Sequence, residues 1–223
     1  MKIDQDNHRM KKILSILKKE YADVKPALDF KTPFELLIAT ILSAQCTDAR
    51  VNIVTRDLFE KLKTPEDYLK VNNSELEKII FSTGFYKQKS KSIKLCCETL
   101  MNQYKGKVPV DFDKLTQLPG VGRKTASVVL GNAFGIPAIA VDTHVIRLTN
   151  LLGFMETKDP KKIESRLKEL VDKKNWINFT HWLISHGRKV CIARRPKCLE
   201  CVIVNECPSN NILDNTNLTK GSK

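Results

Sequence analysis

Repeated helix-start signals constrain the fold of this chain more than any other feature of its sequence. Thr32-Pro33-Phe34-Glu35 combines an N-cap threonine, a first-turn proline and a glutamate that can cap in return. Apolar residues follow at helical spacing as far as Leu42. Other predicted starts are Thr47, Thr64-Pro65, Ser74, Asp142, Asp159-Pro160 and Asn175, and predicted stops are Gly84, Gly153 and Gly187. About ten helices can be counted, and residues 136–141 form the only strand-like run, so we predict an all-α fold.

The composition narrows the class of protein. The 223 residues suffice for one large domain or two small ones, and 42% hydrophobic with 28% charged residues excludes disorder for most of the chain. The 38 Lys and Arg against 25 Asp and Glu give a net charge of +13, which favours a polyanionic partner, nucleic acid first. No apolar run approaches the roughly 18 residues of a membrane span, and the N-terminus lacks a signal-like segment. We therefore expect a cytoplasmic protein without membrane contact.

A glycine-rich turn is the clearest candidate for binding DNA. The segment Leu118–Ala126 lies between a short predicted helix, residues 113–117, and an apolar helical run. Its two glycines allow a turn that presents backbone N–H groups beside a helix N-terminus, where a phosphate oxygen can bind. The candidate DNA contacts are Gly120, Val121, Gly122 and Arg123. The pattern is typical of a helix-hairpin-helix motif, with an ordinary helix connection as the alternative.

Lys124 follows the turn directly and has two possible roles. It can neutralise a phosphate, or it can act as a nucleophile. A lysine of ordinary pKa is protonated at neutral pH, so nucleophilic use needs the neutral amine. A helix N-terminus and partial burial both disfavour the ammonium form, and we expect both at this position.

The C-terminal cysteines have the spacing Cys-x6-Cys-x2-Cys-x5-Cys, and they are Cys191, Cys198, Cys201 and Cys207. Without a secretion signal, such a cluster is typical of metal ligands. Four thiolates match the one ligand per iron of a 4Fe-4S cluster, and structural zinc is the alternative. The loop between the first two cysteines carries the candidate phosphate contacts Arg194, Arg195 and Lys197, which otherwise belong to a solvated loop.

Four motifs in this order resemble the endonuclease III family of bifunctional DNA glycosylases: Leu42–Gln45, Leu118–Ala126, Val141–His144 and the cysteines, within a match from about residue 10 to Cys207. The resemblance implies that Lys124 attacks C1′ of a damaged nucleotide, expels the base and forms a Schiff base, after which elimination cuts the strand on its 3′ side. It implies that Asp142, otherwise a helix N-cap, assists deprotonation of the amine and stabilises the charge on the sugar. It also implies that the cysteines hold a 4Fe-4S cluster. We expect a structural role for the cluster, because it would hold both ends of the basic loop.

Two further residues acquire a role by resemblance. Gln45, in the turn between two predicted helices, matches a residue that enters the gap left by the flipped nucleotide. Phe85, in Gly84-Phe85-Tyr86, stands where the family has an aliphatic second wedge. The alternatives are an amide that satisfies its own turn and a buried core phenylalanine. After Phe85, Lys87, Lys89, Lys91 and Lys94 offer phosphate contacts or a solvated helix face.

The resemblance implies two helical lobes with a DNA-binding cleft between them. Residues 26–136 form a six-helix lobe with the hairpin, and residues 1–25 plus 137–207 form the cluster lobe. Composition predicts that residues 208–223 are a disordered tail. The implied partner of this monomer is double-stranded DNA with an oxidised or ring-reduced pyrimidine or an abasic site. Alternatives are a monofunctional mismatch glycosylase and a non-catalytic DNA-binding module.

Overall fold

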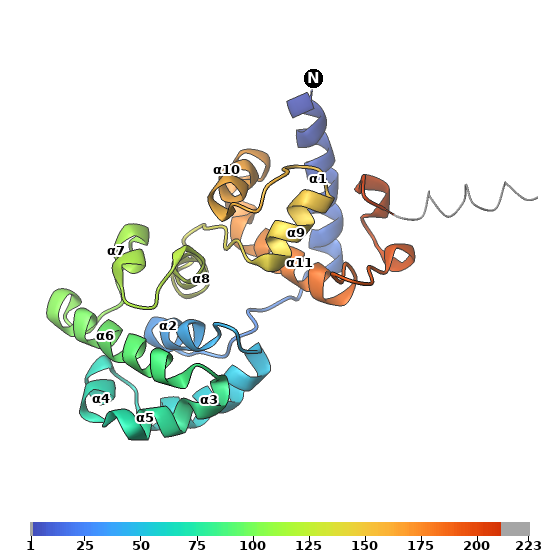
Figure 1. The fold of residues 1–223 in the computed structure, drawn as a ribbon. Coiled ribbons are helices and arrows are strands. Elements are labelled where there is room, and N and C mark those ends of the chain that lie inside the picture. The colour runs from blue at the N-terminus through green and yellow to red at the C-terminus, as the bar shows by residue number, and fades with distance from the viewer. Residues whose placement is uncertain (1, 211–223) are drawn as a thin grey trace, which may run out of the picture. The chain divides into compact units, whose positions relative to one another are not determined.

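The structure is a computed structural model that describes residues 2–210, which form eleven α-helices and four short 3-10 helices and contain no strand (Figure 1). The prediction of an all-α fold is therefore confirmed. The strand-like run at residues 136–141 has no regular secondary structure. Of the predicted tail, residues 211–223 lie outside the described residues. Within residues 2–210, no helix combines the length and the apolar character needed to cross a bilayer.

The chain divides into two compact units. Unit 1 consists of Met1–Lys25 and Ile139–Lys223, and unit 2 consists of Pro26–Ala138. The helices of unit 2 are α2 (Pro33–Leu42), α3 (Asp48–Lys61), α4 (Pro65–Lys70), α5 (Asn73–Ile80), η1 (Phe81–Thr83), α6 (Tyr86–Tyr104), α7 (Phe112–Gln117) and α8 (Arg123–Phe134). Those of unit 1 are α1 (Lys2–Glu20), α9 (Thr143–Leu151), α10 (Pro160–Leu170), η2 (Lys173–Asn175), α11 (Trp176–Lys189), η3 (Cys198–Glu200) and η4 (Val204–Glu206).

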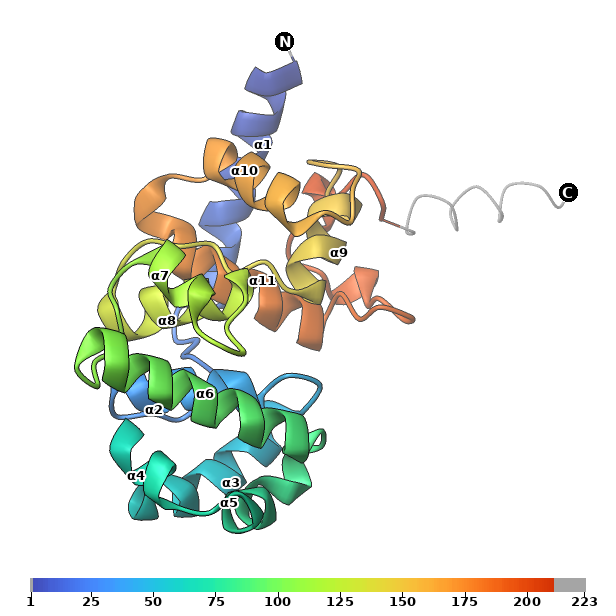
Figure 2. The same cartoon turned by 60° about the vertical axis from the view of Figure 1, so that its left-hand side comes forward.

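Unit 2 is built around α2, whose residues are buried almost without exception. Helix α2 packs against α3, α6 and α8, and α6 also covers α4 and α5 (Figure 2). The predicted N-caps Thr32, Thr47 and Thr64 each accept a hydrogen bond from the backbone amide three residues on. The start predicted at Ser74 lies at Asn72 instead, whose side chain accepts from the Glu75 amide at 2.8 Å. Local sequence therefore determines most helix starts in this unit.

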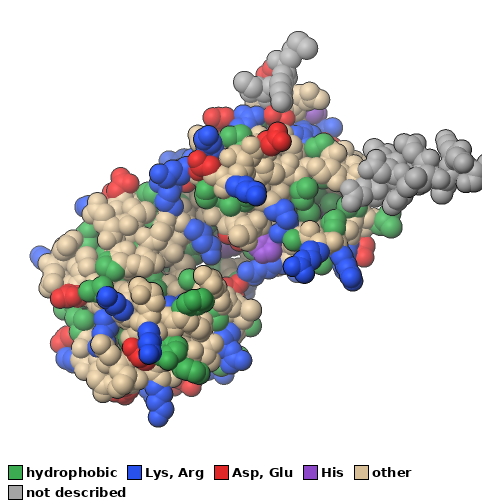
Figure 3. Space-filling view, viewed as in Figure 1, with side chains coloured by type: hydrophobic (Ala, Val, Ile, Leu, Met, Phe, Trp, Pro, Cys, Tyr) green, Lys and Arg blue, Asp and Glu red, His purple; other side chains and the backbone are tan. Residues whose placement is uncertain are grey.

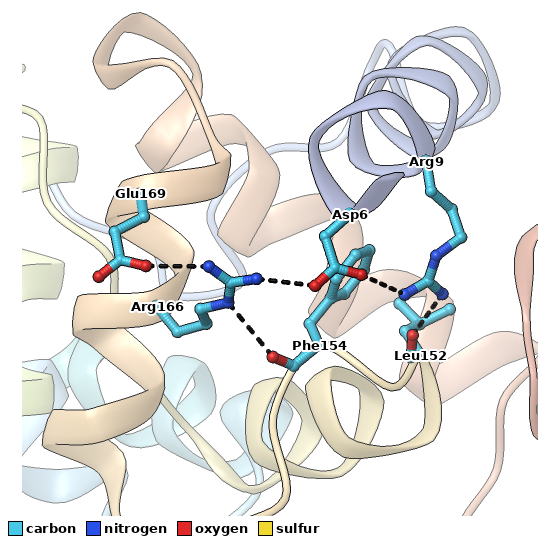
Figure 4. Close-up of polar contacts among 6 residues, drawn as sticks. All are labelled: Asp6, Arg9, Leu152, Phe154, Arg166 and Glu169. Carbon is cyan, nitrogen blue, oxygen red and sulfur yellow. Dashed lines mark hydrogen bonds and ion pairs between the residues drawn. The ribbon is translucent and has the colours of Figure 1, made fainter. Parts of the chain in front are cut away.

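Unit 1 joins α1 to helices from the far end of the chain. Helix α1 packs against α10 and α11, and its Met10, Ile13 and Leu17 are fully buried in the core of this unit. Polar contacts add to this packing (Figure 4). The Arg9 guanidinium donates to the carbonyls of Leu152 and Glu206 and lies 4.2 Å from the centre of the Phe154 ring.

An ion pair fastens α1 to α10. The Asp6 carboxylate lies 2.7 Å from the Arg166 guanidinium of α10 and 3.3 Å from that of Arg9, and Arg166 also pairs with Glu169 at 2.9 Å (Figure 4). The Asp6 and Arg166 side chains are mostly buried, so solvent screens their ion pair less than a surface pair. Helix α1 is therefore held by paired charges as well as by apolar contacts.

The prediction that Gly187 ends a helix is wrong, because Gly187 lies inside α11. A Cβ at this position would lie 2.8 Å from Nδ1 of His144 and 3.2 Å from its Cβ. Glycine is thus required by the close approach of α9 to α11, a contact between residues far apart in sequence. The stop predicted at Gly153 is found directly after α9, where the residue has a φ of 70°.

Candidate active site and nucleic-acid contacts

The hairpin turn joins α7 to α8, and the structure explains the presence of glycine differently at its two glycine positions. Gly120 has a φ of +79°, and a Cβ there would lie 3.0 Å from the Cβ of Ser92 on α6. Both the backbone conformation and the close approach therefore require glycine. Gly122 has a negative φ, and a Cβ there would meet nothing within 4 Å. Its lack of a side chain leaves the approach to the start of α8 open.

The backbone amides available to a phosphate are those at the start of α8. The Val121 side chain is buried, and its amide already donates to the Leu118 carbonyl at 3.0 Å. The amides of Lys124 and Thr125 lie in the first turn of α8, where a helix offers no internal acceptor. Arg123 places its guanidinium 4.6 Å from the centre of the Phe112 ring on α7. Its own hydrogen bond thus holds the hairpin turn in place. The positive charge available to a phosphate lies at the N-terminal end of α8.

The side chain of Lys124 is exposed at the start of α8. The expected partial burial is therefore wrong, whereas the expected helix N-terminus is present. A bound nucleotide would have to supply the exclusion of water that the protein itself does not provide at this amine.

Asp142 is the N-cap of α9. Its Oδ1 accepts from the Val145 amide at 2.8 Å, and the side chain is half-buried. This hydrogen bond uses Oδ1 and holds the Asp142 carboxylate at the start of α9. The position of Oδ2 is fixed with it. Burial lowers the pKa of the neighbouring His144, although the Asp142 carboxylate acts in the opposite direction. The N-cap alternative and a catalytic role are compatible.

Gln45 and Phe85 both lie in turns of unusual backbone conformation. Their φ angles are 54° and 50°, in the left-handed region that non-glycine residues rarely adopt. Both side chains are exposed, Phe85 by 65%, which excludes the alternative of a core phenylalanine. Each turn therefore presents a side chain to the surface of unit 2.

The lysines after Phe85 do not share one role. Lys87 and Lys91 are exposed, as a phosphate-contacting or solvated face requires. Lys89 is only 5% exposed, and its Nζ donates to the carbonyls of Leu42 and Thr83 at 2.8 Å each. Lys94 donates to the Val71 carbonyl. The interpretation of Lys89 as a phosphate contact or a solvated lysine is therefore wrong.

The four C-terminal cysteines line a single cavity of about 150 Å³ in unit 1, among mainly apolar residues. Burial raises the pKa of the Cys201 thiol to about 11, and the neighbouring cysteines act in the same direction. Burial therefore disfavours the thiolate forms, and a bound cation is what would stabilise four thiolates around this cavity. Among the described residues, no three His, Cys, Asp or Glu side chains converge on a single metal-ion position.

Residues that no spacing pattern had singled out support this cavity. The Nη2 of Arg147 donates to the carbonyls of Cys191 at 2.6 Å and Gly187 at 3.0 Å. His186 lies between the Tyr21 hydroxyl, at 2.9 Å from its Nδ1, and Cys201 Sγ, at 3.5 Å from its Nε2. Since these partners are distant in sequence, no local signal could have found them.

The basic loop between the first two cysteines is closed at its base. The carbonyl of Val190 accepts from the amides of Ile192 at 2.9 Å and Lys197 at 3.0 Å. Arg194 and Arg195 are exposed, and Lys197 forms an exposed pair with Glu200 at 3.4 Å. More widely, Lys and Arg side chains are spread over the face shown in Figure 3.

Comparison with known proteins defines the class. Residues 38–173 match the family model of the HhH-GPD superfamily base excision DNA repair proteins, and the chain belongs to this family. It is 46% identical over 209 residues to endonuclease III of Synechocystis sp., covering 93% of this chain and 95% of the relative. It is 48% identical over 189 residues to endonuclease III of Bacillus subtilis, covering 84% and 86%.

A solved structure is similar over nearly the same length. It is a trapped endonuclease III–DNA covalent intermediate, an estranged-adenine complex, with a TM-score of 0.88, 45% identity, and coverage of 92% of this chain and 96% of the other. Within its family, the chain is a base excision repair enzyme of the endonuclease III type, a DNA glycosylase with abasic-site lyase activity. The family and the activity predicted from the sequence are thereby confirmed.

Proposed function

We propose that this enzyme acts as a monomer on duplex DNA that carries an oxidised or ring-reduced pyrimidine or an abasic site, and that Lys124 is its nucleophile. The observation that carries the proposal is the exposed Lys124 in the first turn of α8, two residues after Gly122 of the hairpin turn. A trapped covalent intermediate with DNA, described for a similar protein, supports a covalent mechanism. The preference for pyrimidines rests on the resemblance. We also propose that the enzyme works in the cytoplasm, because the similar proteins come from bacteria, in which the DNA lies in the cytoplasm.

The chemistry follows from a neutral amine at this position. Lys124 Nζ attacks C1′ of the flipped nucleotide, the bond from C1′ to the base breaks, and the base leaves with a proton. Opening of the sugar ring gives the protonated Schiff base. Loss of a proton from C2′ then expels the 3′ phosphate, which cuts the strand. Water hydrolyses the Schiff base and returns the lysine.

Asp142 is the proposed acid–base and electrostatic partner. Its Oδ1 is engaged with the Val145 amide, so the N-cap bond orients the carboxylate while Oδ2 can take a proton. A fixed negative charge near the sugar stabilises the positive charge that develops on C1′ without reorganising during the reaction. The helix cap is thus the device that orients the carboxylate.

The DNA contacts are proposed on three kinds of group. The first-turn amides of α8 and Arg123 bind phosphate after the lesion, and Arg194, Arg195 and Lys197 follow the backbone elsewhere. Gln45 and Phe85 enter the gap left by the flipped nucleotide, because both are exposed on fixed turns. Phe85, at the second wedge position, can stack on a base. The preference of the enzyme for the base opposite the lesion should therefore be measured.

We also propose that Cys191, Cys198, Cys201 and Cys207 hold a 4Fe-4S cluster. The fit rests on four thiols around one cavity with a mainly apolar wall. When bound, the cluster supplies a structural cross-link that fixes both ends of the basic loop, and it takes no part in the glycosidic step. A visible absorption typical of iron–sulfur proteins together with iron found by metal analysis would support this assignment, whereas stoichiometric zinc would overturn it.

Borohydride trapping on a duplex with a single dihydrothymine tests the function. Lys124→Ala should abolish the covalent adduct and strand incision, while the exposed Lys107→Ala retains both. Asp142→Asn keeps a good N-cap but loses the charge, so we expect an unchanged melting temperature and about a 100-fold slower reaction. Free base without an adduct would instead indicate a monofunctional glycosylase, and binding without either product a non-catalytic module.

A further inference from the structure

One buried lysine in unit 2 has no role in the chemistry above. Lys89 lies in the first turns of α6, is only 5% exposed, and donates through Nζ to the carbonyls of Leu42 and Thr83 at 2.8 Å each. Leu42 is the last residue of α2, and Thr83 is the last residue of η1. The Leu42 carbonyl therefore lies just before the turn that contains Gln45, and the Thr83 carbonyl lies just before the turn that contains Phe85.

The backbone carbonyls around the Lys89 ammonium group favour a positive charge at this position. The Leu42 carbonyl stands at the C-terminal, negative end of α2, where a positive charge is favoured. Burial nevertheless lowers the pKa of Lys89, with Cys46 opposing, so this burial has a cost that apolar packing would avoid. A buried charge that is retained despite such a cost calls for a reason beyond filling space.

The geometry of the two turns supplies that reason. Gln45 follows Leu42 by three residues and Phe85 follows Thr83 by two, and both have the left-handed backbone conformation. Such conformations cost about 1 kcal/mol or more for a non-glycine residue and persist only where the surrounding structure imposes them. The backbone amide of Lys89 also donates to the Phe85 carbonyl at 3.0 Å. Lys89 thus contacts the second turn through its backbone and the first through its side chain.

We propose that Lys89 is a positioning residue that ties the Gln45 turn to the Phe85 turn, so that both side chains enter the DNA at a fixed spacing when the damaged nucleotide leaves the stack. Lys89 itself touches no DNA. The inference rests on the gap-filling role proposed for Gln45 and Phe85, and it adds what holds the pair in register. Its loss should slow the step that needs both side chains, and leave the chemistry of Lys124 intact.

The test compares Lys89→Met, which keeps the length and removes the donors, with Lys61→Met, which removes an exposed lysine at the end of α3. On duplex dihydrothymine under single-turnover conditions, we expect Lys89→Met to slow excision by roughly 30-fold, in line with small misplacements of positioning groups. Incision at an abasic site in single-stranded DNA, which leaves no gap to fill, should stay within about threefold. Lys61→Met should match the parent on both substrates.

A spectroscopic signal separates positioning from general destabilisation. With 2-aminopurine opposite the lesion, binding of the parent enzyme should raise the fluorescence of the estranged base, and Lys89→Met should reduce this rise at saturating protein. Lys89→Gln, which can still donate to one carbonyl, should give an intermediate result and serves if the Met variant does not fold. Equal slowing on both substrates would overturn the inference.

A double-mutant cycle completes the test. In a Gln45→Ala/Phe85→Ala background, Lys89→Met should slow excision no further, because the side chains that it positions are gone. Additive losses would overturn the role of Lys89 and leave the gap-filling role standing. If Gln45→Ala/Phe85→Ala alone leaves excision unchanged, the gap-filling role fails and the inference fails with it, whereas Lys124 trapping would be unaffected.

Discussion

The two units are both helical, but different forces hold them together. Unit 2 is one continuous segment with an apolar core around α2. Unit 1 combines α1 with residues 139–210, and arginines tie its parts together through backbone carbonyls. Arg9 donates to Leu152 and Glu206, and Arg147 donates to Gly187 and Cys191. The proposed nucleophile thus belongs to a unit with an apolar core around α2. The carboxylate and the cysteines belong to a unit in which long-range polar contacts add to an apolar core.

The largest expected effect is the loss of the metal site. Cys198→Ser removes one proposed ligand and should destabilise unit 1 by about 4 kcal/mol or more, because metal binding and folding are coupled at such sites. Hydrogen exchange followed by mass spectrometry should show lost protection for residues 139–207 and retained protection for residues 26–138. Cys46→Ser should keep the metal. Equal loss in both units would break the comparison.

The next effect concerns the polar contacts of α1. Arg9→Met keeps most of the side-chain volume but leaves the Leu152 and Glu206 carbonyls without this donor. Asp6 loses its contact with Arg9 and keeps its ion pair with Arg166 (Figure 4). We expect a loss of about 3 kcal/mol in the unfolding free energy of unit 1. Lys11→Met, on the exposed side of the same helix, should change it by less than about 0.5 kcal/mol. A neutral Arg9→Met would show that apolar packing suffices in unit 1 too.

A smaller effect is expected in unit 2, where the close approach at Gly120 limits the size of the side chain. Gly120→Ala places a Cβ 3.0 Å from Ser92 in a residue with positive φ, and should cost about 2 kcal/mol. Gly122→Ala meets nothing within 4 Å and should cost less than about 1 kcal/mol. Urea titration of the two variants measures the difference. Similar costs would contradict the steric explanation.

The smallest effect is the response to mild acid. All four histidines lie in unit 1, and burial lowers the pKa of His181 and of His144. Their neutral forms stabilise the fold above the unfolded-state pKa of about 6.5, and this contribution is lost as the pH falls below it. In unit 2, hydrogen bonds from Thr64 lower the pKa of Asp67, so its contribution is lost only in stronger acid.

Tryptophan fluorescence can follow the acid response of unit 1, because both tryptophans, Trp176 and Trp182, lie there. The urea concentration at the unfolding midpoint, measured by this signal, should decrease as the pH is lowered from about 7.5 to about 5.5. His181→Gln should weaken that dependence, and constant visible absorbance would show that the metal site is intact. A midpoint independent of pH in this range would refute the expectation.

The sequence is most informative where the cause is local. The threonine caps and the turn at Gln45 depend on residues within one or two helical turns, and their positions agree with the structure. The sequence allows two interpretations of Phe85, and only the exposure of its side chain excludes the core. The proposed roles of Lys124, Asp142 and the cysteines came largely from motif resemblance and stay predictions.

The features that the sequence concealed depend on distant partners. Lys89 belongs to a run of lysines that looks solvated, and only the carbonyls of Leu42 and Thr83 make it an interior residue. Gly187 looks like a helix stop until His144 occupies the space beside it. Arg9 and Arg147 carry no motif at all. In each case the decisive neighbour comes from another element, which periodicity and spacing do not report.

The left-handed backbone at Gln45 and Phe85 bears on how this protein can evolve. Glycine at either position would relieve conformational strain and make the molecule more robust to heat, yet natural selection for repair would remove such a change if the side chains serve the DNA. Thermostable descendants of this chain should therefore accumulate their substitutions elsewhere and keep both awkward residues. Directed evolution for heat resistance alone, without a repair screen, should lose them first.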